Sequence, residues 1–354
     1  MTSQPRHLLL LCLAVDADHP TLNFALGWYR RLLTRYDSID LIAFDVGRHD
    51  LPPAIRVHAV KRPGDWRLAR LWRFWRLAAR LCRERRPLVV FSHMNTALAT
   101  AFWPLACRFR LRLVLWYAHA AVSPLLRCAV AAADRVVTST PEGCRVGNAK
   151  LRCIGQGIDD AVFAPGPDGQ ARIDAVTTGR IAASKNLDRL IDAFVRAGHA
   201  TARLHVIGSP ARREDEALEL DLRRRWAGDP RIVFHGFRSP AEIAAIYRTC
   251  AVFLNLSDTG SLDKANLEAA LAGLAVVTSN RAFAAFVRRH GLPDDLLLGS
   301  SQDDAAPLIR RVLDDPPAAL ARHAAVGAAV AAEHALAGLI ARLGAELAEH
   351  ERVA

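Results

Sequence analysis

Two positively charged side chains lie close together in a segment that predicts a loop between a strand and a helix. The segment Val176–Leu190 contains Gly179, Arg180 and Lys185. In a doubly wound α/β sheet, such a loop lies at the carboxyl edge of the sheet, where ligands bind. Two cations there can grip a diphosphate from two sides and neutralise charge on a leaving group. The segment alone is equally compatible with a solvated pair of surface cations.

A second polar loop precedes a predicted helix in SDTGSLDKANLEAALAGLAVVTSN, residues 257–280. The loop 257–261 follows a predicted strand, and the helix after it carries Glu268. Free N–H groups and the dipole at the start of a helix favour a bound diphosphate. Glu268 can accept hydrogen bonds from ribose hydroxyls, or it can simply satisfy the helix dipole.

Glycines follow two further predicted strands in this half of the chain. Gly208 ends the strand in LHVIGSP, and Gly236 follows the strand in RIVFHGF. A glycine has no Cβ, so the backbone beside Phe237 and Arg238 can approach a flat ligand such as a nucleotide base at little steric cost.

Short apolar runs rich in β-branched residues alternate with helical patterns along the chain. Such runs suit parallel strands that are buried on both faces, and the alternation predicts an α/β protein with two doubly wound, Rossmann-like domains facing a deep cleft. We expect an N-terminal domain at 1–165, a C-terminal domain at 166–330 and a C-terminal helix, interpreted as one amphipathic helix over 331–353, that packs back toward the N-terminal domain. The joint is expected in the Pro- and Gly-rich segment Phe163–Ala171. The expected strands are His7–Val15, Ile39–Asp45, Leu88–Ser92, Leu111–Trp116, Arg135–Thr138, Ala175–Thr178, Arg203–Ile207, Arg231–Phe234, Val252–Leu256 and Ala275–Thr278.

The length, charge and cysteine content narrow the class of protein. The chain has 354 residues, 51% of them hydrophobic, and a formal net charge of +11. These values fit a two-domain globular enzyme with an anionic partner, whether a nucleotide diphosphate, an acidic lipid surface or a nucleic acid. The seven cysteines include no C-x-x-C pair, which argues against structural zinc and disulfides and favours a reducing cytosol. We therefore expect a cytoplasmic protein.

The segment WRLARLWRFWRLAARLCRERR, residues 66–86, predicts a strongly basic helix with eight arginines and one glutamate. One apolar stripe at helical spacing is expected to face the core, with Phe74, Leu77 and Leu81 among the arginines on the outer side. The stripe consists of Leu68, Leu71, Trp72, Trp75, Ala78, Ala79 and Cys82. Two interpretations stay open: an ordinary helix made soluble by arginine, or a patch that binds an anionic membrane surface. Nucleic-acid binding is disfavoured because no stacking platform or known binding module accompanies the charge.

Taken in order, the motifs of residues 175–280 resemble the donor-binding half of the retaining glycosyltransferases of group 1, also called family 4-like. The order is G-R-x4-K-N, a strand ending in glycine, V-F-x-G, and then S-x-T-G-S-L-D-K-x2-L-E-A-x-L-A-G-x-x-V-V. The resemblance implies the GT-B fold, in which two Rossmann-like domains face each other. It also implies that Arg180 and Lys185 hold the donor phosphates and that Glu268 holds the ribose. The same donor site is expected to include Gly179, Gly208 and Phe237.

One position departs from the pattern of this family. The family usually has another glutamate eight residues before the ribose-binding one, where it contacts the transferred sugar, and this chain has Gly260 there. We expect Thr259, Asp263 or backbone amides to take over that contact, with Ser261 and Lys264 in the same loop. The departure leaves the identity of the sugar open, and it also leaves loss of activity open.

The N-terminal half resembles the same family more loosely. His119 follows a predicted strand at a position where the family commonly has a cleft histidine near the donor sugar. His93 and Asn95 end the preceding strand and are expected to help form the cleft. The usual glycine-rich loop after the first strand is not evident in residues 16–23, so we expect acceptor recognition to differ.

The resemblance implies transfer of a sugar from a nucleotide-sugar donor to a saccharide or lipid-linked acceptor with retention of configuration. No carboxylate nucleophile is evident, so we expect front-face substitution, with Arg180 and Lys185 stabilising the leaving diphosphate and His119 positioning the sugar. We expect no metal ion and no cofactor besides the nucleotide-sugar co-substrate, because no D-x-D lies in a suitable loop. A cell-envelope acceptor would suit a basic helix at the inner face of a membrane.

Two other functions stay open at this point. A nucleotide-sugar epimerase of the same fold would convert the donor without any acceptor. A non-catalytic protein that binds a nucleotide sugar at a membrane surface is favoured by Gly260 and by the basic helix.

Overall fold

The computed structural model describes residues 5–19, 22–61, 64, 66–119, 121–166, 171–210 and 212–348. The chain divides into two compact units, and each is described by itself. The N-terminal unit comprises Met1–Gly157 together with Leu336–Ala354, and the C-terminal unit comprises Ile158–Ala335.

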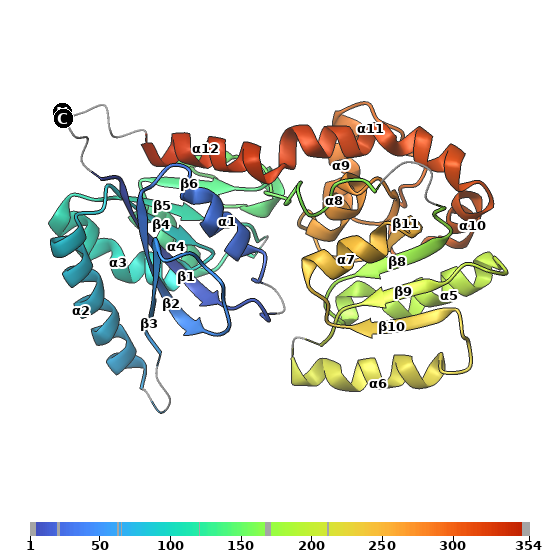
Figure 1. Ribbon diagram of the computed structural model, residues 1–354, viewed down its shortest axis with the longest axis horizontal. Coiled ribbons are helices and arrows are strands. Elements are labelled where there is room, and N and C mark those ends of the chain that lie inside the picture. The colour runs from blue at the N-terminus through green and yellow to red at the C-terminus, as the bar shows by residue number, and fades with distance from the viewer. Residues whose placement is uncertain are drawn as a thin grey trace. The chain divides into compact units, whose positions relative to one another are not determined.

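The N-terminal unit is built on one seven-stranded sheet with the strand order β3-β2-β1-β4-β5-β6-β7, and all neighbouring strands are parallel (Figure 1). Its interior strand β1 has the sequence HLLLLCLAV and is almost entirely buried, as expected for a strand covered on both faces. The strands are β1 (His7–Val15), β2 (Ser38–Val46), β3 (Ile55–Ala59), β4 (Val89–His93), β5 (Arg112–Trp116), β6 (Arg135–Thr138) and β7 (Leu151–Cys153).

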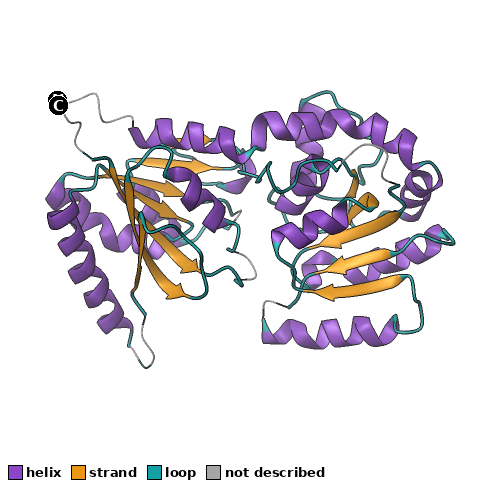
Figure 2. Ribbon diagram, in the orientation of Figure 1, coloured by secondary structure: helices purple, strands orange, loops and turns teal. Residues whose placement is uncertain are grey.

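Helices cover both faces of this sheet (Figure 2). One face packs on α2 (Arg67–Arg85), α3 (Thr96–Phe109) and α4 (Pro124–Ala132), and the other packs on α1 (Ala25–Leu32) and α12 (Leu336–Ala348). A short 3-10 helix, η1 (Pro141–Gly143), follows β6. The N-terminal unit is thus a Rossmann-like domain that is completed by the last described helix of the chain.

The C-terminal unit has a five-stranded parallel sheet in the order β10-β9-β8-β11-β12. Helices α5, α6 and α10 cover one face, and α7, α8, α9 and α11 cover the other. The strands are β8 (Asp174–Thr178), β9 (Leu204–Ile207), β10 (Ile232–Gly236), β11 (Cys250–Asn255) and β12 (Ala275–Thr278). The helices are η2 (Ala183–Lys185), α5 (Leu187–Ala197), η3 (Arg213–Asp215), α6 (Glu216–Arg225), α7 (Pro240–Tyr247), α8 (Lys264–Leu271), α9 (Arg281–Arg289), α10 (Ala306–Asp314) and α11 (Pro316–His334).

The expectation of two Rossmann-like α/β domains is confirmed, and every expected strand is present. The sequence did not predict β3, a half-buried edge strand whose five residues include Arg56 and His58. The unit boundary lies at Gly157, before the Pro- and Gly-rich joint expected at Phe163–Ala171. Residues 167–170 of that joint lie outside the described residues.

The expected single C-terminal helix over residues 331–353 is wrong. The structure has two helices, because α11 ends at His334 and α12 begins at Leu336. Ala335, between them, has a ψ of 144°, which is not helical. Residues 349–353 of the expected helix lie outside the described residues.

The expected orientation of the basic helix is wrong for part of its stripe: Ala78 and Cys82 are buried as expected, but the large apolar residues of the stripe are not. On α2 the buried residues are Phe74, Ala78, Leu81 and Cys82. The expected core residues Leu68, Leu71, Trp72 and Trp75 are 74, 39, 62 and 43% exposed. The helix carries apolar residues over a wide arc, so helical spacing alone could not decide which part of that arc packs on the sheet.

A buried carboxylate joins the amino-terminal ends of three strands in the N-terminal unit. Asp40 on β2 is 1% exposed and accepts hydrogen bonds from Arg56 (2.9 and 3.0 Å) and His58 (2.6 Å), and His7 Nε2 lies 3.0 Å away. Burial alone would raise the pKa of Asp40, but the hydrogen bonds from His58, His7 and Arg56 outweigh it and hold this pKa far below its usual range.

We predict that Asp40→Ala lowers the free energy of unfolding by about 3–5 kcal/mol, because it leaves buried partners without their counter-charge. The folded state favours the carboxylate, so its contribution is present above the unfolded pKa of about 4 and is lost as the pH falls below it. Urea unfolding at neutral and acidic pH measures both effects. Asp45→Ala is the matched control, because Asp45 is 53% exposed in its pair with Lys61 and should cost less than about 1 kcal/mol. Equal losses in the two variants would contradict the assignment.

Candidate functional site

Two glycines bring the carboxyl ends of β8 and β9 into contact. Gly179 and Gly208 have φ angles of +146° and +141°, which side chains other than glycine rarely adopt. A Cβ on Gly208 would lie 1.7 Å from the carbonyl oxygen of Gly179. The amide of Gly179 donates to Ile207 O (3.0 Å), and the amide of Gly208 donates to Gly236 O (2.8 Å). The ends of three adjacent strands are therefore fixed directly beside the loop that carries Arg180.

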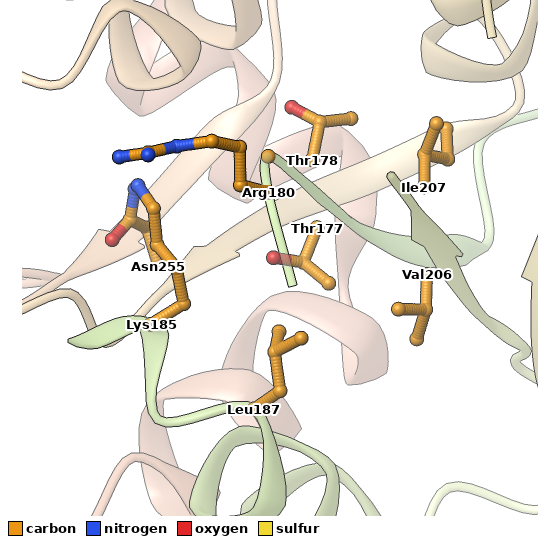
Figure 3. A pocket seen from close by; sticks show the side chains of 9 residues that line it. Thr177, Thr178, Arg180, Lys185, Leu187, Val206, Ile207 and Asn255 are labelled. Atoms are coloured by element: carbon orange, nitrogen blue, oxygen red, sulfur yellow. The ribbon is translucent and has the colours of Figure 1, made fainter. Parts of the chain in front are cut away.

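Arg180 and Lys185 line the same small cavity, of about 10 Å³, at the carboxyl end of β8, as the sequence predicted for this loop (Figure 3). Thr178 and Asn255 also line it. Arg180 is exposed, and it forms no ion pair with any residue that the structure describes. Its charge is therefore available to an anionic ligand.

Lys185, in contrast, has a counter-ion. Its ammonium pairs with Asp263 Oδ2, which also accepts a hydrogen bond from Asn255 Nδ2 at 2.9 Å. The Lys185 and Asp263 side chains are only 14 and 13% exposed. Burial alone would raise the pKa of Asp263, but the charge and hydrogen bond of Lys185, with Asn255 and the Ala265 amide, hold this pKa below its usual value. The pair links the loop after β8 to the start of α8.

Asp263 is the residue immediately before α8, so the ion pair lies at the amino end of that helix. Glu268 follows in the second turn of α8 and pairs with Lys264 at 2.8 Å, and both side chains are largely buried. The structure therefore brings Lys185, Asp263, Lys264 and Glu268 to one helix end, where the amino-terminal dipole adds positive potential.

The polar loop 257–261 is held in place before α8 begins. Ser257 Oγ and Thr259 Oγ1 share a hydrogen bond of 2.9 Å. Asn280 Nδ2 donates to Ser261 O (3.0 Å) and Thr259 O (3.3 Å), while its own side-chain oxygen accepts from Phe283 N and caps α9. Gly260, in place of the glutamate of the family pattern, is exposed in this loop.

Three asparagines of this region were not assigned a role from the sequence. Asn255 and Asn280 hold Asp263 and the polar loop. Asn186 has a left-handed φ of 48°, and its side chain donates to Leu256 O and Asp258 Oδ2, both at 2.8 Å. The available signal was their position: Asn255 ends a strand, Asn280 precedes a helix, and Asn186 belongs to the K-N of the first motif. Their partners are distant in sequence, so position alone could not show the contacts.

The buried phenol of Tyr247 lies within hydrogen-bond distance of Thr178. Tyr247 Oη lies 2.8 Å from Thr178 Oγ1 and is fully buried. Burial, together with the carboxylates of Glu268 and Asp263, raises the pKa of Tyr247 well above its usual value. The phenol therefore stays protonated and acts as a neutral hydrogen-bonding group.

Two further predicted site residues, Phe237 and His119, do not line this cavity. Phe237 is half-buried and follows Gly236 at the end of β10, consistent with an approach by a flat ligand. His119 belongs to the N-terminal unit, where it is exposed after β5 and accepts a hydrogen bond from Ala121 N at 3.0 Å. Its role near the donor sugar stays a prediction from the resemblance.

The expectation that His93 and Asn95 help to form a cleft is wrong. His93 is 2% exposed, packs against Trp28 with ring centroids 5.0 Å apart, and lies 2.9 Å from Tyr29 Oη. Burial lowers the pKa of His93 to about 3, so the ring is neutral. Asn95 is 5% exposed and caps α3 through Leu98 N. Both residues are structural, because the aromatic core of this unit extends to the strand end.

The described residues contain no group of three or more His, Cys, Asp and Glu side chains able to hold a metal ion. Among the same residues, no helix is both long and apolar enough to cross a bilayer.

The fold of the whole chain is that of the GT-B glycosyltransferases. Sucrose-phosphate synthase from Thermosynechococcus elongatus matches with a TM-score of 0.74 at 17% identity, covering 96% of this chain and 97% of that one. HepE from Anabaena, in complex with UDP-glucose, matches with a TM-score of 0.76 at 18% identity, covering 97 and 99%. An α,α-trehalose-phosphate synthase (UDP-forming) from Burkholderia xenovorans, in complex with glucose-6-phosphate, matches with a TM-score of 0.68 at 16% identity, covering 96 and 99%.

Part of the C-terminal unit also matches a known protein family. Residues 172–315 match the family described as Glycosyl transferases group 1, and this range holds all the predicted donor-site residues except His119. A search of curated proteins found no match. The chain thus has the GT-B fold, and its residues 172–315 match the group 1 glycosyltransferase family, as the motifs of residues 175–280 predicted.

We predict that Gly208→Ala destabilises the C-terminal unit by at least about 1–3 kcal/mol, because the left-handed backbone and the contact with Gly179 O leave no room for a methyl group. Gly228→Ala is the control, since a Cβ there meets nothing within 4 Å. Thermal unfolding of both variants measures the difference. A Gly208→Ala protein as stable as the control would show that this contact is not a constraint.

Proposed function

We propose that the protein transfers a sugar from a nucleotide-diphosphate sugar to a saccharide or lipid-linked acceptor, with retention of configuration and without a metal ion. The observation that carries the proposal is the cavity at the end of β8, which is lined by Arg180, without an ion-pair partner among the described residues, and by Lys185, which pairs with Asp263. The group 1 family match of the same segment supports it.

The chemistry follows from the charges at this edge of the sheet. Breaking the bond between the anomeric carbon and the diphosphate leaves negative charge on the departing diphosphate. Preorganised cations stabilise that charge. Arg180 can bind the diphosphate without giving up another partner. Lys185 exchanges the Asp263 carboxylate for phosphate, and the amino-terminal dipole of α8 adds to the binding. Retention follows a front-face substitution, in which the leaving oxygen takes the proton of the attacking hydroxyl.

The first donors to test are UDP-sugars. HepE was solved with UDP-glucose, and the trehalose-phosphate synthase is described as UDP-forming. In this chain we expect Glu268 to accept the ribose hydrogen bonds, with its carboxylate held by Lys264 at 2.8 Å. Thermal shift with UDP-, GDP-, ADP- and TDP-sugars identifies the base, because a ligand that binds only the folded state raises the unfolding temperature.

We predict that Arg180→Ala lowers kcat/KM for transfer by roughly 10²–10³-fold, as expected for the loss of one group that stabilises the leaving-group charge. Its unfolding temperature should not change, because the exposed Arg180 side chain pairs with no described residue. Arg189→Ala is the matched control: Arg189 is a half-buried arginine of α5 that hydrogen-bonds to Gln302. Unchanged turnover in Arg180→Ala would remove the basis of the proposed mechanism.

The variant Asp263→Asn distinguishes two effects of the Asp263 carboxylate. One is competition with phosphate for Lys185, and the other is a contact with the transferred sugar. The amide no longer competes with phosphate for Lys185, so we predict that UDP alone binds more tightly, by roughly fivefold. Transfer should become slower if the carboxylate also replaces the missing glutamate in contacting the sugar. Titration calorimetry with UDP and a transfer assay measure the two effects. Weaker UDP binding would mean that Asp263 supports the phosphate site instead of opposing it.

A second candidate function is binding of the nucleotide sugar without catalysis. Gly260 favours it, because the loop provides no carboxylate at the position where the family contacts the sugar. Donor binding with no transfer to any acceptor, and no release of UDP, would establish this alternative. Conversion of the donor in the absence of an acceptor would instead indicate an epimerase.

A further inference from the structure

Four of the seven tryptophans are exposed on one layer of the N-terminal unit. Trp66, Trp72 and Trp75 lie at the start of α2 or within it, Trp103 lies on α3, and they are 78, 62, 43 and 52% exposed. Leu68 and Leu71 lie between the tryptophans of α2 and are exposed as well. We define these six residues as the tryptophan surface.

The tryptophan surface adds little to the hydrophobic core of the domain, since its six side chains are exposed. Phe74, Ala78, Leu81 and Cys82 already supply the buried face of α2, which packs on the sheet. The remaining three tryptophans of the chain are buried or half-buried. Monomeric proteins rarely expose a contiguous patch of this kind unless it binds something.

The tryptophan surface spans two helices that are fixed to each other. Trp75 Nε1 donates to Ala101 O of α3 at 2.7 Å. In Figure 1, α2 is the outermost helix of the layer and α3 lies next to it. The four exposed indoles are therefore carried by two neighbouring helices that are joined to each other.

The same layer is strongly basic. Helix α2 has seven arginines and one glutamate, and α3 and α4 each have one arginine and no acidic residue. Arg76 lies over the Trp72 ring, 5.3 Å from its centroid. Among the residues that the structure describes, Arg67, Arg76, Arg80 and Arg83 have no carboxylate partner.

We propose that the tryptophan surface and the arginines of α2 dock the protein on an anionic phospholipid bilayer. Indole rings prefer the headgroup level of a bilayer, leucines enter the acyl boundary, and guanidinium groups bind lipid phosphates. A nucleic acid would use the arginines but would gain nothing from Leu68 and Leu71. A second copy of this chain would place arginines against arginines. Docking concerns the N-terminal unit and needs no nucleotide sugar, so it stands or falls independently of the proposed sugar transfer.

Vesicle sedimentation of the full chain tests the proposal. The protein should bind vesicles containing phosphatidylglycerol and should bind pure phosphatidylcholine at least about tenfold more weakly, with binding falling as salt is raised. Brominated lipids should quench the tryptophan fluorescence, because most of the indoles lie on the tryptophan surface. Failure to bind phosphatidylglycerol vesicles at low salt would overturn the proposal.

Two variants separate the apolar and the charged contributions. A Trp66→Ala, Trp72→Ala, Trp103→Ala protein should lose at least about tenfold in vesicle binding, and so should Arg76→Glu with Arg80→Glu. The matched control is Leu220→Ala with Arg224→Glu on α6, where an exposed leucine also lies beside arginines. That control should bind like the wild type. Circular dichroism checks that each variant is folded, which the exposure of all the replaced side chains favours.

Binding of a nucleic acid or of a second copy of the chain at the tryptophan surface would give different results in these experiments. Tighter binding to a DNA duplex than to anionic vesicles at equal salt would assign the surface to nucleic acid and would refute the proposal. A concentration-dependent dimer that the tryptophan variant abolishes, with no vesicle binding, would assign it to a second copy. Vesicle binding that is equal in the wild type and both variants would place the lipid contact elsewhere.

Discussion

Burial of both sheet faces is the constraint from which the candidate site follows. In each unit a parallel sheet lies between two layers of helices, so the polar groups of an interior strand reach solvent chiefly at its ends. In the C-terminal unit this brings the ends of β8, β9, β10 and β11 to one edge. The left-handed glycines at Gly179 and Gly208 then let two of these ends touch. The phosphate-binding geometry that we propose is a consequence of this packing.

The cations at that edge are arranged unequally. Arg180 is exposed and unpaired among the described residues, whereas Lys185 is paired with a largely buried carboxylate. A buried ion pair is costly to leave half-formed, so Lys185 and Asp263 fix each other in the absence of ligand. An anion that binds to Lys185 must supply the charge that Asp263 gives up. In the proposed function, Lys185 is therefore already fixed before the donor binds. The group that fixes it is Asp263, at the start of α8.

The two units present different kinds of surface. The C-terminal unit concentrates polar contacts at one sheet edge, where three asparagines hold loops in place. The N-terminal unit instead exposes tryptophans and arginines on a layer of helices. Sugar transfer to a lipid-linked acceptor would join these two properties, since the acceptor would be presented at the surface to which α2 binds.

The sequence by itself determined the fold class, the ten listed strands (but not β3), and the segments that carry Arg180, Lys185 and Glu268. Apolar runs and strand–helix alternation are local patterns, and each motif is continuous in the chain. Only the tertiary structure decided which side of α2 is buried, that His93 is a neutral core residue, and that Lys185 pairs with Asp263. Those outcomes depend on residues that are far apart in sequence. Lys185 and Asp263, for example, are separated by 78 residues. Helical spacing fixes the direction of side chains relative to one another, but packing selects the face that is removed from water.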